Sequence, residues 1–212
     1  MQYTLGNTVR PRLYDRPLVA TQPGTWPAPP IGPLCIEHEG EWTVCPDGQI
    51  EQLAILPASY DDWLGFKATW DIGQINLTSI SVEVTTPSPD PAIIAGIALA
   101  LENPSHFMEL EIYCSGASTF FGLYRTRWPE ETEFVTCFQE LIPPLSPATT
   151  YKLQAAINGQ KFTCKLLLGS AEIKSVIYTG GRTTGTRFGF YDAKNAPSRI
   201  GIARFNNLDI TI

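Results

Sequence analysis

Hydrophobic and polar residues alternate along much of this chain, most clearly at its end. Leu208, Ile210 and Ile212 alternate there with Asp209 and Thr211. A period of two places successive side chains on opposite faces of a β-strand, so that one row faces a core and the other faces water. Similar segments, separated by turns rich in glycine and proline, predict about a dozen short strands. The pattern therefore predicts an all-β protein made of two packed sheets.

Two other segments add detail to this expectation. Residues 152–157 and 161–168 flank Asn158-Gly159, a pair that supplies the two positive-φ positions of a type I′ hairpin turn. The longest apolar run, residues 92–101, has about half of the ~20 residues that a membrane-spanning helix needs. We expect this run to form a strand that is buried on both faces, and we expect no membrane span.

The closing segments carry a family resemblance. Residues 185–191 read Gly-x-x-Phe-Gly-Phe-Tyr, residues 203–210 read Ala-Arg-Phe-Asn-Asn-Leu-Asp-Ile, and Thr-Thr-Tyr-Lys-Leu stands at 149–153. Together with the Asn-Gly hairpin, these motifs make residues 63–212 resemble the concanavalin A-like, or laminin G-like, jelly rolls. The resemblance implies a two-sheet antiparallel β-sandwich. Because that fold serves glycan-binding modules, glycoside hydrolases and structural attachments alike, function must be argued from a site.

The first 34 residues differ in composition from the rest. Their seven prolines exclude a helix or a central strand and favour an extended, partly polyproline II conformation. We therefore predict an arm at residues 1–34 and a sandwich domain at residues 35–212. Three arginines against one aspartate give the arm a charge of +2 and leave −8 for the remainder of a chain whose net charge is −6. The arm residues expected to contact a neighbouring subunit are Arg10, Arg12, Arg16 and Trp26.

The sequence shows neither a complete catalytic motif nor a secretory signal, which favours a structural or attachment protein. In this interpretation the sandwich is a subunit of a homo-oligomer or larger assembly, such as a virus or phage particle. The basic arm would lie across the acidic body of the next subunit, with charge attraction setting the register. The expected location is then a virion or the cytoplasm. A net charge of −6 argues against a general nucleic-acid partner.

The alternative function is glycan binding. Tyrosine, arginine and tryptophan residues lie close together in the middle of the sequence. Exposed rings stack on sugars and charged groups orient them, although the same residue types also pack against neighbouring elements or form protein interfaces. The candidate ligand-binding residues are Tyr113, Tyr124, Arg125, Arg127 and Trp128.

A third hypothesis, glycoside hydrolysis, rests on Glu109 and Glu111. Residues two apart on a strand point the same way, and retaining glycosidases use two carboxyl groups about 5–5.5 Å apart. The run Glu109-Leu110-Glu111-Ile112 resembles part of the Glu-x-Asp-x-x-Glu strand of laminarinase-like hydrolases. It departs from that motif because the middle acid is glutamate and the third position falls on Tyr113 or Cys114. A solvated strand face explains the pair more simply, so we expect no enzyme.

A calcium site is the last candidate. Asp192 and Asn195 offer oxygen ligands of the kind that calcium prefers, and jelly rolls of the type that the chain resembles carry calcium on an edge loop. A polar turn accounts for both residues equally well, and we expect no cofactor.

The five cysteines do not suit a complete disulfide framework. Cys114 and Cys164 are in phase with apolar residues of their strands and should face the core. Cys35 and Cys45 are the only pair suspected of forming a disulfide, and the lack of a Cys-x-x-Cys motif argues against zinc.

Overall fold

The computed structural model is built from β-strands in two antiparallel sheets, which confirms the predicted β-sandwich. Among the residues that it describes there is no helix, and therefore none that could cross a membrane. The described residues are 2–5, 8–14, 36–38, 42–53, 65–71, 77–103, 105–115, 117–127, 135–193 and 202–211.

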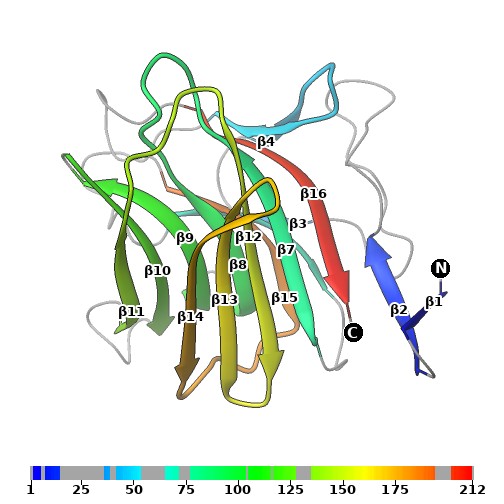
Figure 1. Cartoon of the computed structure of the whole chain (residues 1–212). Coiled ribbons are helices and arrows are strands. Elements are labelled where there is room, and N and C mark those ends of the chain that lie inside the picture. The colour runs from blue at the N-terminus through cyan, green and yellow to red at the C-terminus, as the bar shows by residue number, and fades with distance from the viewer. Residues whose placement is uncertain are drawn as a thin grey trace.

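The larger sheet has nine strands and follows the order β1-β2-β16-β7-β12-β13-β14, with β5 pairing with both β16 and β4. In Figure 1 this sheet lies in front of the other one. Its strands are β1 (Gln2–Leu5), β2 (Thr8–Tyr14), β4 (Trp42–Val44), β5 (Ile50–Gln52), β7 (Ser79–Thr85), β12 (Thr150–Asn158), β13 (Lys161–Leu168), β14 (Ala171–Thr179) and β16 (Arg204–Thr211).

The second sheet has seven strands in the order β11-β10-β9-β8-β15-β6-β3. Its central strands β8, β9 and β15 lie behind the larger sheet in Figure 1. The strands are β3 (Ile36–His38), β6 (Phe66–Asp71), β8 (Ile94–Asn103), β9 (His106–Ser115), β10 (Ser118–Arg127), β11 (Val135–Ile142) and β15 (Arg187–Asp192).

The core lies between the two sheets, where each strand contributes every second side chain. In β12 the buried residues Leu153 and Ala155 alternate with Gln154, and in β9 the buried residue Leu110 faces them from the other sheet. Burying each large apolar side chain in this way stabilises the fold by about 1.5–3 kcal/mol. Cys164 is part of this core and Cys114 packs against it, as the strand periodicity predicted.

Four aromatic side chains pack together in the core. The ring centroid of Phe190 lies 5.7 Å from that of Trp70, 5.1 Å from that of Phe205 and 6.3 Å from that of Trp42. These residues come from four different strands, so their rings join the two sheets. The long strand β8 is buried on both faces, as predicted for the apolar run.

Part of the predicted arm is a β-hairpin. β1 and β2 pair with each other, and β2 continues onto β16 through Tyr14↔Ile210 and Arg12↔Thr211. The expectation that the prolines would exclude a central strand is therefore wrong for this segment. Pro11 pairs with Gln2 at the end of β1 and has no partner in the β16 register, so its missing N–H costs no bond there. Arg10 lies in the same strand, whereas Arg16 and Trp26 lie outside the described residues.

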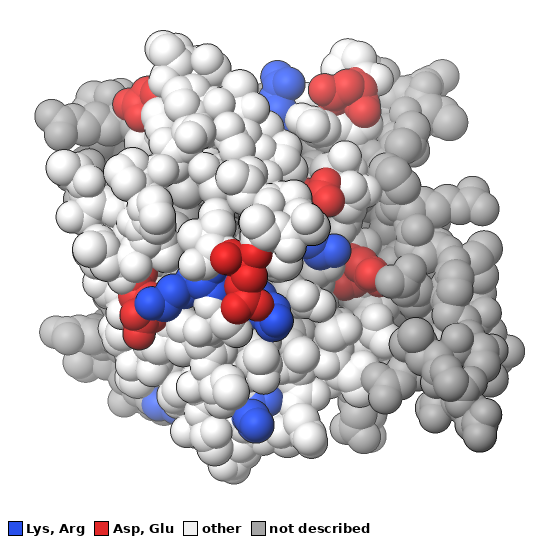
Figure 2. Space-filling view, in the orientation of Figure 1, with Lys and Arg blue, Asp and Glu red and all other residues white. Residues whose placement is uncertain are grey.

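The outer face of the nine-stranded sheet is polar and only sparsely charged. Figure 2 shows this side of the molecule, with positive and negative side chains lying next to each other near its middle. One ion pair on this face joins Lys165 to Glu172 at 2.7 Å, and a second, between Lys174 of β14 and Glu140 of β11 at 2.8 Å, joins the two sheets at their edge. Partly exposed pairs of this kind add roughly 0–1 kcal/mol each. This face is therefore an ordinary solvated sheet surface.

Candidate functional site

The unusual surface of the sandwich is the outer face of the seven-stranded sheet, meaning the side that points away from the nine-stranded sheet. On β9, Leu110 and Ile112 point into the core, so the alternation of the strand directs Glu109, Glu111 and Tyr113 to the outer face. The grouping of these three residues follows from the period-two pattern alone. What the pattern could not show is how the neighbouring strands line up beside them.

The two glutamates have small neighbours on the adjacent strands. Glu111 pairs with Gly122 of β10 on one side and with Gly96 of β8 on the other. Glu109 pairs with Ala98 of β8. Directly opposite residues on adjacent strands lie side by side on one face, so small residues flank Glu111 on both sides, while Glu109 has Tyr124 of β10 as its other neighbour.

Aromatic rings occupy the neighbouring positions. The rings of Tyr113 and Phe120 are stacked, with centroids 5.0 Å apart and an interplanar angle of 22°. Tyr124 packs edge-on against Tyr113 at 6.4 Å, and its hydroxyl donates a 3.3 Å hydrogen bond to Gln139 Oε1. Tyr113 and Phe120 are half-buried, whereas Tyr124 is buried. Tyr124 lies over Gly122, where a Cβ atom would collide with its ring.

Both carboxyl groups are buried. Glu109 is 3% exposed and Glu111 is 7% exposed, and Oε2 of each has no hydrogen-bond partner in the part of the chain that the structure describes. The simpler prediction of a solvated strand face is therefore wrong. Strand alternation fixes the face to which a side chain points, but it does not reveal whether the rest of the chain leaves that face open to water.

Burial controls the protonation of this pair. It raises the pKa of Glu111 to about 8, and the charge of Asp192 adds to the effect. It also raises the pKa of Glu109 well above its usual range, with a further increase from Glu111 and an opposing effect of the Lys67 ammonium. At neutral pH the proton therefore stays on Glu111. The same burial, reinforced by the carboxyl charges, raises the pKa of the Tyr124 phenol.

Lys67 is the buried cation of the outer face. It is 1% exposed, donates a 3.2 Å hydrogen bond to the Gly65 carbonyl and lies 4.0 Å from the centroid of the Phe107 ring. Tyr191, which pairs with Lys67 across β6 and β15, packs against Phe107 at 6.1 Å. Sequence reasoning did not select these residues or Phe120 as site residues. Only the strand register brings them beside the glutamates.

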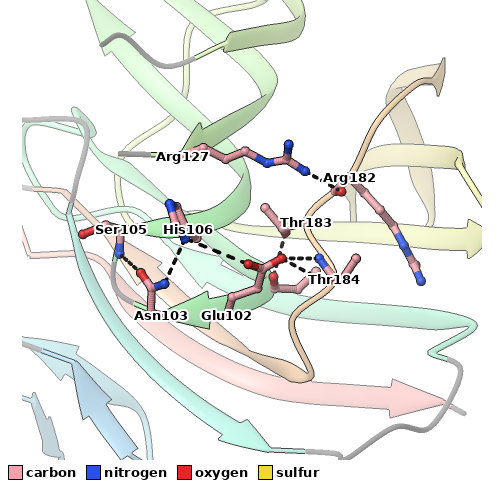
Figure 3. Close-up of polar contacts among 9 residues, drawn as sticks. Glu102, Asn103, Ser105, His106, Arg127, Arg182, Thr183 and Thr184 are labelled. Carbon is pink, nitrogen blue, oxygen red and sulfur yellow. Dashed lines mark hydrogen bonds and ion pairs between the residues drawn. The ribbon is translucent and has the colours of Figure 1, made fainter. Parts of the chain in front are cut away.

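The arginines proposed for ligand binding lie elsewhere. Because Tyr124 and Arg125 are adjacent on a strand, they point to opposite sides of the sheet. Arg125 Nη1 donates to the Gly181 carbonyl at 3.3 Å, and Arg127 Nη2 donates to the Arg182 carbonyl at 3.1 Å (Figure 3). Both side chains therefore hold the 180–186 loop rather than completing the tyrosine surface. Trp128 lies outside the described residues.

The same loop is fixed from β8. Glu102 Oε1 accepts hydrogen bonds from the Thr184 amide at 2.6 Å and the Thr184 hydroxyl at 2.9 Å, while Thr183 donates to the Ala100 carbonyl at 2.7 Å. These bonds to Thr184, and the nearby positive charges, lower the pKa of Glu102. His106 Nδ1 lies 3.9 Å from Glu102 Oε2 (Figure 3). The loop joins β14 to β15 and thus crosses from one sheet to the other.

The remaining candidates are separated in the structure or fall outside its described part. Asp192 is buried at the end of β15, and Asn195 is not among the described residues. No group of three or more His, Cys, Asp or Glu side chains in the described ranges is arranged to hold a metal. Cys45 carries a free thiol, and its suspected partner Cys35 is not described. Burial and a hydrogen bond with Glu51 raise the pKa of Cys45 to about 11.

Comparison with known proteins is informative at the level of the fold. No protein-family model and no curated protein sequence matches this chain. Among solved structures, the carbohydrate binding module CBM66 from Bacillus subtilis superposes with a TM-score of 0.56 and 10% identity, covering 82% of this chain and 92% of that one. The exoplasmic/lumenal domain of VIP36, in its Ca²⁺/Man-bound form, gives a TM-score of 0.58 and 8% identity, covering 85% and 83%.

An enzyme is also among the similar structures. The GH43 protein BlXynB from Bacillus licheniformis gives a TM-score of 0.55 and 12% identity over 79% of this chain. This chain spans only 34% of that protein. These identities are too low to transfer an activity. The superpositions show that this chain shares the β-sandwich fold of these structures.

Proposed function

We propose that this protein is a carbohydrate-binding β-sandwich that binds its glycan on the outer face of the seven-stranded sheet. The observation that carries the proposal is the stacked, half-buried pair Tyr113 and Phe120. Aromatic rings that stand on a sheet with part of their surface exposed offer an apolar surface for the C–H groups of a sugar ring. Gln139 beside them is exposed and supplies an amide for sugar hydroxyls.

The similar structures support this function over the structural and attachment role that the sequence favoured. One is a carbohydrate binding module and another is a sugar-bound domain, whereas none of those reported above is a particle protein. Assembly through the N-terminal arm stays a prediction. The two functions are compatible, because a subunit of a particle can also bind a host glycan.

The same face argues for binding without hydrolysis. A glycosidase must bring one carboxyl group to the leaving oxygen and the other to the anomeric carbon or an attacking water. Glu109 and Glu111 are buried, and the Oε2 atoms are covered, so neither group reaches a bound sugar in this conformation. We therefore assign the pair no catalytic step, although one of the similar structures is a GH43 protein.

A glycan-array screen followed by calorimetry tests the proposal. Tyr113→Ala and Phe120→Ala should each weaken binding of any glycan found by about tenfold or more, since stacking on a ring contributes roughly 1–3 kcal/mol in related recognition. Ile177→Ala is the matched control, because Ile177 is 61% exposed on the opposite sheet. Equal loss in the control, or no glycan bound by the folded protein, would contradict the proposal.

A further inference from the structure

A row of apolar side chains crosses the outer face of the seven-stranded sheet. The strand register places Phe120 of β10 between Leu141 of β11 and Tyr113 of β9. On its other side, Tyr113 lies opposite Ile94 of β8. Because directly opposite residues on neighbouring strands share one face of a sheet, each of the adjacent strands β11, β10, β9 and β8 (Figure 1) contributes one member. These residues form the apolar row.

The apolar row is open at one end and closed at the other. Leu141 stands on β11, the end strand of this sheet in the described part of the chain, and it is 65% exposed. Phe120, Tyr113 and Ile94 are half-buried. Past Ile94, the amide of Ala193 donates a 2.9 Å hydrogen bond to the Ile94 carbonyl, and Ala193 is only 1% exposed. A ligand can therefore lie on the row as far as Ile94, and it can leave the row only over Leu141.

Two uncharged polar residues lie beside the apolar row. Gln139 of β11 is exposed and pairs with Gly122, two residues after Phe120 on β10. Ser118, two residues before Phe120, is half-buried on the other side of the row. Both can exchange hydrogen bonds with sugar hydroxyls. The apolar row itself favours a neutral ligand, because a charged group would lose its hydration against these side chains.

The spacing of the apolar row matches one kind of glycan. Neighbouring strands lie ~4.8 Å apart, so the row is straight and about 14 Å long. An extended β-linked glucose chain of the cellulose type advances by nearly the strand spacing at each sugar, so one sugar falls on each strand. All its ring hydroxyls are equatorial, which leaves C–H groups on both ring faces. An α-linked chain would coil away from a straight row, and an axial hydroxyl would place a polar group against it.

We propose that the apolar row binds the end of a neutral, β-linked chain with equatorial hydroxyls, such as a cello-oligosaccharide, whose last sugar lies at Ile94 and whose remainder leaves the protein over Leu141. This inference rests on the proposed function, because it names the class of glycan that the same face binds and the direction in which it lies. One sugar on each strand gives four positions. Affinity therefore rises up to the tetrasaccharide and then stays constant.

Calorimetry with cello-oligosaccharides of increasing length tests the closed end. The hexamer should bind within about twofold of the tetramer, and cellobiose should bind about tenfold more weakly or worse. The hexamer can be reduced at its reducing end or methylated at its non-reducing end. One of these two changes should weaken binding about tenfold, because only one end of the chain meets Ala193. A hexamer that tolerates both changes lies across the site by its middle, which overturns the inference.

Leu141→Ala tests the direction of the chain. It removes the contact to the outermost sugar, so affinity for the tetramer should fall about threefold to tenfold, while the affinity for cellobiose, measured by NMR titration, stays the same. Since Leu141 is largely exposed, the urea midpoint should hardly change. Val135→Ala is the matched control on the same strand, because Val135 pairs with Arg125 and so points to the other side of the sheet. A Leu141→Ala effect that is equal for both sugars, or absent, contradicts the inference.

Failure of this inference can be told apart from failure of the proposed function. If a glycan of another class binds and Tyr113→Ala removes that binding, the proposed function stands and the apolar row does not select a β-linked chain. If the folded protein binds no glycan at all, both are wrong.

Discussion

Tyr124 lies over Gly122, its neighbour but one on β10, so closely that even a methyl group at position 122 would collide with the phenol ring. Glycine is required here by packing, because the backbone of Gly122 does not have the positive φ angle that favours glycine elsewhere in the chain. The contact fixes the direction of Tyr124 toward Gln139. It thus links one glycine to the geometry of the proposed glycan surface.

Gly122→Ala should displace Tyr124 and lower the free energy of unfolding by about 1–3 kcal/mol, as overpacking commonly does. Urea denaturation measures this change. In a double-mutant cycle, Tyr124→Ala removes the ring with which the new methyl group collides, so Gly122→Ala should cost little in that background. Additive effects of the two substitutions would show that the collision is not the cause.

Stability should depend on pH through the buried glutamates. The pKa of Glu111 is about 8 in the folded protein, against an ordinary value of 4.5. Below about pH 4.5 the group is protonated in both states and costs nothing. As the pH rises toward 8, the unfolded chain loses a proton that the folded chain keeps, so the free energy of unfolding falls by up to about 1.4 kcal/mol per pH unit for each such group.

Chemical denaturation at a series of pH values between about 4.5 and 8 measures this slope. In Glu111→Gln the slope should be smaller and the protein should be more stable than the wild type at the upper end of the range. A variant with the same slope as the wild type would show that Glu111 is not the group that titrates.

The alternation of residues along each strand predicts which side chains of this site share a face, but it does not predict their neighbours on the adjacent strands. The alternation along β9 places Glu109, Glu111 and Tyr113 on one face, and the structure agrees. Alternation also puts Arg125 and Tyr124 on opposite faces of the sheet. Grouping the two as one ligand-binding set, because they are neighbours in the sequence, overlooked this. The neighbours across strands depend on register, which the turns and bulges set. A bulge between Leu123 and Tyr124 shifts the β10–β11 pairing and cannot be read from the sequence of β10 alone.

Burial of the outer face was the other feature that the sequence did not reveal. Alternating polar residues normally indicate a solvated face, as they do on β12. On β9 the same pattern belongs to a covered face, where Phe107 and Tyr191 form a second apolar cluster. A large aromatic residue in the polar row, as Phe107 is beside Glu109, is the signal that could have predicted this cover.

Glu102 should hold the loop between β14 and β15 in place. Glu102→Ala removes the acceptor of two bonds from Thr184, which we expect to destabilise the protein by about 1–2 kcal/mol. Glu102→Gln keeps a carbonyl acceptor and should cost less. Because the pKa of Glu102 is lowered in the folded protein, its charge stabilises the fold above its ordinary pKa, and that contribution is lost as the pH falls through the folded-state pKa.

Hydrogen exchange locates the effect of these Glu102 variants. The Thr184 amide should exchange faster in Glu102→Ala, while amides in the middle of β12 keep the protection expected from the global free energy of unfolding. Unchanged exchange at Thr184 would mean that the loop does not depend on Glu102.

Because the arginines and the tyrosines point to opposite sides of the sheet, Arg127 on β10 and Tyr113 on the neighbouring strand β9 should give opposite phenotypes. Arg127→Ala removes the 3.1 Å bond to the Arg182 carbonyl, so it should loosen the loop, lower the free energy of unfolding by about 1 kcal/mol and leave glycan affinity within about twofold. Tyr113→Ala should instead weaken glycan binding and leave the loop in place, because the half-buried ring of Tyr113 lies on the proposed binding surface. Urea denaturation and calorimetry on both variants decide the matter. If Arg127→Ala abolishes binding in a folded protein, the glycan site lies at the loop end of the sandwich, and Tyr113 and Phe120 are packing residues.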